Sequence, residues 1–148
     1  MADFEFNIAK GKEAYYASLP AASDALIWVP IEDTGCESDA TLKDYDDLGT
    51  LLAASNNEQT TMGRVTATGV TVTVDDSGDK VTLDCDNPVW TSVAASALTK
   101  KLLLCYDGDT GAGTDSNIVP IFGFDFAVTP AGGNITATVN AAGLADLT

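Results

Sequence analysis

The chain contains no histidine among its 148 residues. Histidine is the commonest general base and the usual partner of serine and cysteine nucleophiles, so its absence removes those catalytic pairs. Carboxylates are plentiful, but acid–base catalysis needs two of them in one cleft with separated pKa values, and a sequence does not reveal that arrangement. We therefore predict a protein that is not an enzyme and that uses no cofactor.

Basic residues are also scarce, because lysine and arginine together number 7 against 22 acidic residues, which gives a net charge of −15. Phosphate contacts need clustered basic side chains, and anionic membrane surfaces repel an acidic chain. We expect neither nucleic acid nor a membrane as a partner. The net negative charge has two interpretations: it keeps a crowded protein soluble, or it complements a basic patch on a partner.

Long apolar runs and cysteine pairs are missing as well. No run approaches transmembrane length, and the N-terminal segment lacks the apolar core of a signal peptide. The three cysteines, Cys36, Cys85 and Cys105, are an odd number without a CxxC spacing. We expect them to be reduced and mostly buried, and a zinc site would lack a fourth ligand.

What the sequence does contain favours a mainly β fold, either a β-sandwich or a partly open barrel, with α+β as the lesser alternative. The length suits a single domain, here residues 13–148, and threonine and valine suit pleated, half-buried surfaces. Apolar runs or alternation predict strands at residues 25–31, 65–74, 81–85, 101–106, 118–128 and 135–139.

One helix is predicted, around residues 40–54. Leu42, Tyr45, Leu48 and Leu52 recur at helical spacing and form an apolar stripe, and the residues just before this stripe can cap its first turn. Outside this segment the pattern is that of strands and turns.

A β-hairpin is predicted where Val70, Val72 and Val74 alternate with threonine ahead of a short acidic turn. The alternation slips by one residue just before this strand, so we expect a bulge at Gly69 to restore the phase. Within the turn, Gly78 is expected to adopt a positive φ.

Residues 1–12 carry Phe4, Phe6 and Ile8 in strand-like alternation. The segment is either an N-terminal arm that adds to a neighbouring subunit or an ordinary edge strand of the same domain. These three side chains are candidates for partner or oligomer contact. Trp28 and Trp90 are further candidates, as core or interface anchors.

The loop from Asp107 to Asp115 is the most suggestive place for a metal. Asp107, Asp109 and Asp115 could offer hard oxygen ligands to Ca²⁺. The loop departs from the EF-hand pattern, however, in its missing third acidic position, its misplaced glycine and its lack of a closing glutamate. We therefore predict a polar hairpin loop and regard the three aspartates as weak metal candidates.

The opening MADFEFNIAKGK resembles the start of a family of small virion proteins encoded in the structural-gene clusters of tailed bacteriophages. Further stretches resemble the same family in order and spacing over most of the chain. The series carries the resemblance, since no single motif is diagnostic: residues 1–12, 39–48, 74–77, 90–91, 103–110, 114–120 and 124–130.

The resemblance implies a non-enzymatic virion protein, most often a decoration (cement) protein that binds the outside of the expanded capsid and stabilises it. It implies the major capsid protein and further copies of the chain, as a trimer, as partners. The protein would be made in the cytoplasm of the host bacterium and reside on the capsid exterior. The alternatives are a tail or head–tail connector subunit and, less favoured, a Ca²⁺- or glycan-binding adhesion module.

Overall fold

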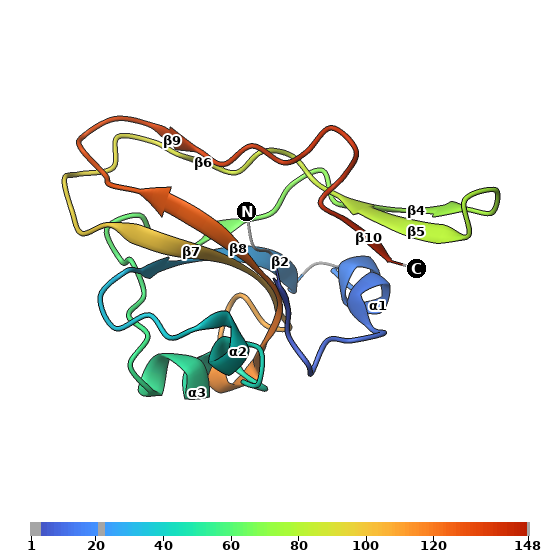
Figure 1. The fold of residues 1–148 in the computed structure, drawn as a ribbon, viewed down its shortest axis with the longest axis horizontal. Coiled ribbons are helices and arrows are strands. Elements are labelled where there is room, and N and C mark those ends of the chain that lie inside the picture. Colours follow the sequence, from blue (N-terminus) through green and yellow to red (C-terminus); the bar gives the residue numbers. More distant parts are fainter. Residues whose placement is uncertain (1–3, 21–22, 148) are drawn as a thin grey trace.

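A five-stranded antiparallel sheet forms the centre of the molecule in the computed structural model, which describes residues 4–20 and 23–147 (Figure 1). The prediction of a mainly β fold is confirmed. In spatial order the strands are β1 (Phe4–Glu5), β8 (Ile118–Val128), β7 (Thr99–Asp107), β2 (Ala25–Glu32) and β3 (Val65–Thr66).

Strand β2 explains why this sheet is the core. Its run of apolar residues is buried at every position from Ala25 to Ile31, because both faces of the sheet are covered. Leu26 and Trp28 join the apolar cluster on one face, whereas Ile27 and Val29 join the cluster on the other. Successive side chains of a strand point to opposite faces, so a doubly covered strand must be apolar throughout.

Two short helices, α2 (Asp39–Leu42) and α3 (Leu48–Ala53), cover the second face of the sheet (Figure 1). They replace the single helix predicted around residues 40–54. The break arises because Asp47 adopts an extended backbone and caps α3, its carboxylate accepting the Thr50 N–H at 2.7 Å. An N-cap residue has non-helical dihedrals, so the aspartate that starts α3 also separates it from α2.

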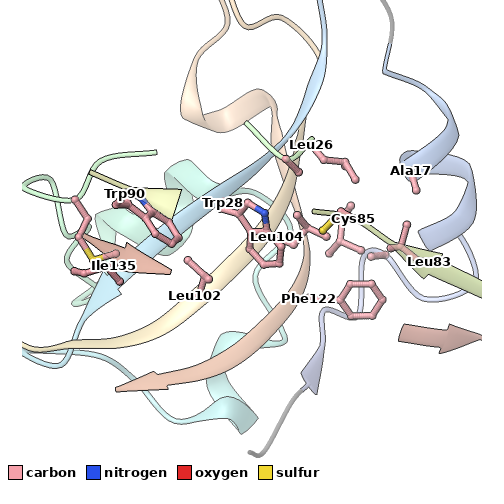
Figure 2. Packing of buried hydrophobic residues seen from close by; sticks show 14 of the residues in the cluster. Ala17, Leu26, Trp28, Leu83, Cys85, Trp90, Leu102, Leu104, Phe122 and Ile135 are labelled. Atoms are coloured by element: carbon pink, nitrogen blue, oxygen red, sulfur yellow. The ribbon is translucent and has the colours of Figure 1, made fainter. Parts of the chain in front are cut away.

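The face of the sheet that carries Leu26 and Trp28 is covered mainly by short strands. A two-stranded ribbon of β6 (Val89–Trp90) and β9 (Ile135–Thr136) lies over it (Figure 1). A second sheet continues beside the ribbon and consists of β4 (Thr71–Asp75), β5 (Lys80–Asp84) and β10 (Ala145–Leu147). Figure 2 shows Trp28, Leu102 and Leu104 of the central sheet between Trp90 and Ile135 on one side and Leu83 on the other.

The predicted hairpin is confirmed as β4 (Thr71–Asp75) paired with β5 (Lys80–Asp84). The single strand predicted over residues 65–74 is two strands, because β3 pairs with β2 in the central sheet and β4 begins at Thr71 in the second sheet. Gly69 lies between them with a φ of +61°, next to a hydrogen bond of 2.8 Å from the Asp86 N–H to the Thr68 carbonyl. In the turn, the expectation for Gly78 is wrong: Asp79 takes the positive φ, at 50°. Aspartate tolerates this left-handed region better than most residues.

Helix α1 (Glu13–Ser18), strands β6 and β10 and the 3-10 turn η1 (Asp115–Asn117) have no counterpart among the predicted elements. Helix α1 packs beside the hairpin, and β10 pairs with β5. The 3-10 turn η1 completes the elements between β7 and β8. Within the described residues, none of the helices is both long enough and apolar enough to cross a membrane.

Candidate partner-binding surfaces

Of the five predicted contact residues, the structure buries three in the chain's own core. Phe6 has no exposed surface, and Trp28 and Trp90 are each 2% exposed. Phe4 and Ile8 are partly buried beside the helical cluster. Phe6 and the two tryptophans therefore pack inside the single chain, and partner contact stays a prediction for all five residues.

The N-terminal strand pairs within its own chain. Phe4 lies opposite Gly123 of β8, and the Phe6 N–H donates to the Ile121 carbonyl at 3.0 Å. The absence of a side chain at Gly123 makes room for the Phe4 ring, since a methyl group built there would overlap with it. This is the edge-strand alternative, in the arrangement that the single chain adopts.

A buried cation, Lys101, lies under this strand. Its side chain is 5% exposed and is ion-paired with Asp39 at the start of α2 and with Asp125 on β8. Its amino group also lies 5.4 Å from the centre of the Phe4 ring. Burial by itself lowers the pKa of Lys101, but the hydrogen bonds to the two carboxylates outweigh that effect and raise it.

Sequence reasoning missed this cluster. The available signal was Lys101 directly before the buried apolar run of residues 102–105 in β7. A buried charge requires partners, but the sequence does not say which of the 22 acidic residues supply them.

The aspartates of the 107–115 loop are engaged in the loop itself. Asp107 accepts the Asp109 N–H at 3.0 Å, and Asp109 accepts the N–H groups of Gly111 and Ala112 at 3.1 Å each. Asp115 lies elsewhere, in an ion pair of 2.7 Å with Arg64. The structure does not bring the three carboxylates together, and no cluster suited to a metal ion occurs among the described residues.

Arg64 ties this loop to the rest of the molecule. Its guanidinium makes two hydrogen bonds to Glu58, at 2.9 and 2.6 Å, in addition to its pair with Asp115. The hydrogen bonds to these carboxylates raise the pKa of Arg64 above its ordinary value. A planar guanidinium suits this arrangement, because its fork of donors can hold two carboxylates at once.

The cysteines lack the environment of a nucleophile. All three are free thiols; Cys85 and Cys105 are buried, and Cys36 is partly buried. Burial raises the pKa of Cys85 to about 11 and also raises the pKa values of Cys36 and Cys105. A reactive cysteine requires the opposite shift, since the thiolate is the reacting species.

A cavity of about 460 Å³ lies between the central sheet and residues 137–144. Its apolar lining comes from both sides, and the buried N–H of the Trp28 indole has no acceptor among the described residues. Asp125 also lines the cavity, but its carboxylate pairs with Lys101. The cavity therefore offers apolar contact and shape rather than acid–base chemistry. The principal apolar lining residues are Trp28, Leu102, Phe124, Phe126, Val139 and Leu144.

The hairpin of β4 and β5 presents a different surface. It projects from the body of the molecule (Figure 1), and Val74 near its tip is 67% exposed, the highest value among the large hydrophobic residues described as exposed. Aspartates at positions 75, 76 and 79 surround this valine along the turn.

Comparison of the chain with protein-family models, with curated proteins and with solved structures gave no match.

Proposed function

We propose that the protein is a non-enzymatic virion component of a tailed bacteriophage, a decoration protein that binds the outside of the expanded head. The observation that carries the proposal is the series of stretches, ordered from the first dozen residues to residue 130, that resembles a family of such proteins. Small proteins that bridge neighbouring capsomers stabilise a shell through many modest contacts acting together.

The distribution of charge supports this role. Four of the seven basic residues are held in ion pairs: Arg64, Lys80, Lys100 and Lys101. The remaining surface is strongly acidic, so packaged DNA would repel it from the interior of the head, whereas a basic patch on the outer shell would attract it.

Partners in this proposal are the major capsid protein and further copies of the chain, as a trimer. Cyclic closure suits the threefold positions of a shell. If the subunits exchange their N-terminal strands, the contacts that Phe6 makes inside one chain would form between chains instead, because a swapped element keeps its partners.

Co-sedimentation with expanded heads that lack the protein, prepared from the same phage, tests the proposal. We expect saturable binding on the order of hundreds of copies per head, since each of the many equivalent shell positions takes a subunit. Unexpanded heads are the control and should bind poorly. Absence of binding to expanded heads, together with recovery in isolated tails, would instead support the tail or connector assignment.

A further inference from the structure

Strand β4 is an edge of its sheet, whose order is β10–β5–β4. On β5 the Leu83 carbonyl accepts the Leu144 N–H at 2.8 Å, so Leu83 directs its backbone groups toward β10 and away from β4. Val72, which lies opposite Leu83, therefore belongs to a non-hydrogen-bonded pair and directs its own N–H and C=O outward. Val74 does the same, because the alternation repeats every two residues.

The outward backbone groups lie beside an apolar row. Val74, Val81 and Leu147 are opposite one another on β4, β5 and β10 and share one face of the sheet. A hollow of about 430 Å³ at the hairpin tip is lined by this row. A strand added to β4 would place a side chain next to Val74 and above this hollow.

The rim of the hollow is acidic. Asp75, Asp76 and Asp79 line it, and the lysine that shares the lining, Lys80, is paired with Asp146 at 2.8 Å. A lysine or arginine fits both parts of such a hollow, because its aliphatic stem packs on apolar residues while its charged end meets carboxylates.

A second copy of the chain fits this edge poorly. Antiparallel pairing of two β4 strands would bring the acidic turn of each copy toward Asp84 and Asp86 of the other. Like charges that meet in this way are destabilising. The charge favours a basic partner.

We propose that the edge of β4 binds an extended segment of a partner protein, which adds as a fourth strand and places a lysine or arginine in the hollow. Backbone hydrogen bonds to Val72 and Val74 would supply affinity, and the basic side chain would supply selectivity. This inference rests on the proposed function for the identity of the partner, because on that reading the segment belongs to the major capsid protein.

Val74→Pro tests the edge directly. Proline removes the outward N–H and leaves the ladder to β5 intact, since proline is tolerated on an edge strand whose N–H faces solvent. Val74→Thr is the matched control, because it keeps the N–H and the β-branched shape. With expanded heads as the probe, we expect proline to weaken binding about tenfold or more and threonine to change it by less than about threefold.

Asp76→Asn/Asp79→Asn provides a second test that does not depend on proline being accommodated. Asparagine keeps the size of each side chain and tolerates the positive φ of residue 79. We expect weaker binding and a shallower dependence of affinity on salt, because screened charge pairs are removed. Thermal unfolding of each variant, compared with wild type, establishes that it is folded. Wild-type affinity in both folded variants would overturn the inference.

Failure of the proposed function is a separate outcome. If the wild-type protein does not bind heads, a second probe judges the edge: a capped peptide of alternating valine and threonine with a lysine at either end. Titrated into the ¹⁵N-labelled full chain, it should shift the amide resonances of Val72 and Val74, and a peptide with glutamate in place of lysine should not. Unshifted resonances at millimolar peptide would overturn the inference.

Discussion

Strands β2 and β4 are both rich in β-branched residues, yet they have opposite surroundings. Seven of the eight residues of β2 are buried, whereas no residue of β4 is. Strand β2 has a hydrogen-bonded neighbour on each side and apolar clusters on both faces, while β4 is an edge strand on a projecting hairpin. The first strand lies within the core, and the second has a strand neighbour on one side of its sheet and none on the other.

The contrast between β2 and β4 predicts where a substitution should lower the free energy of unfolding and where it should not. Free energy of unfolding depends on apolar area and on close packing, both of which are concentrated around the central sheet. Leu83 of β5 is buried in the core, but the exposed residues of β4, such as Thr73 and Val74, can vary with little effect on stability. The following experiments test this division, from the largest expected effect to the smallest.

Leu103→Ala should have the largest effect. Leu103 is fully buried on β7 in the cluster under the helices. Loss of its apolar surface together with the cavity left behind should lower the free energy of unfolding by about 2–5 kcal/mol. Leu98→Ala, at a site that is 38% exposed, is the matched control and should cost less than about 1 kcal/mol. Equal losses in urea denaturation would contradict the division.

Gly123→Ala should lower the free energy of unfolding by about 1–3 kcal/mol, because the new methyl group overlaps with the Phe4 ring. Gly133→Ala is the control, since a methyl group there meets nothing within 4 Å. In a Phe4→Ala background the cost of Gly123→Ala should fall. A cost that persists in full would show that the Phe4 ring is not its source.

Asp47→Ala should cost about 0.5–2 kcal/mol, because it removes the cap of α3 and leaves the Thr50 N–H without its acceptor. Asp46→Ala removes the same charge from an exposed neighbouring position and should have little effect. Thermal unfolding of the two variants separates capping from net charge, and matching Tm values would contradict the capping role.

Tyr106 should make stability fall at high pH. Its hydroxyl donates to Asp24 at 2.7 Å, and this hydrogen bond raises the pKa of Tyr106 to about 12 from its ordinary value of 10. A pKa that is raised in the folded state contributes stability that is complete below pH 10 and is lost as pH rises toward 12. Absorbance at the tyrosinate band should show a late-titrating tyrosine that Tyr106→Phe removes. If every tyrosine of the wild-type protein ionised at its ordinary pH, the raised pKa of Tyr106 would be contradicted.

Val74→Thr should have the smallest effect, a change in the free energy of unfolding within about 0.5 kcal/mol, because the side chain is 67% exposed. A loss comparable to that of a buried residue would mean that the hairpin belongs to the core, and the comparison of β2 with β4 would no longer hold.

Several elements were predictable from local pattern alone. The apolar run at residues 25–31 became β2, and the alternation on either side of the acidic turn became the hairpin. These features depend on the pattern of apolar residues, which is a property of neighbouring residues.

The helical segment shows where local pattern fails. Leu42, Tyr45, Leu48 and Leu52 fit one helical stripe, yet the chain bends between α2 and α3. Aspartate supports a helix start as readily as it occupies an exposed helical face, and Asp47 takes the first role here. The apolar spacing does not distinguish the two, because both keep the leucines against the sheet.

For the candidate contact residues, too, the sequence indicated which side chains to consider, and the fold decided their surroundings. The sequence indicated five candidates for partner contact: Phe4, Phe6, Ile8, Trp28 and Trp90. In the single chain, Phe6 and the two tryptophans are buried, and Phe4 and Ile8 are partly buried. The exposed edge of β4 was not predicted as a surface. This edge is unpaired because β10 occupies the other side of the hairpin, and no strand was predicted at the position of β10.

The sequence by itself determined the β-rich class, the positions of most strands, the acidic surface and the absence of histidine chemistry, because each follows from composition or from neighbouring residues. Tertiary structure decided which carboxylates Lys101 meets, which aromatic residues are buried, and which edge of the second sheet stays open. Those outcomes depend on contacts between residues far apart in the chain, and only packing in three dimensions selects among the many pairings that the sequence permits.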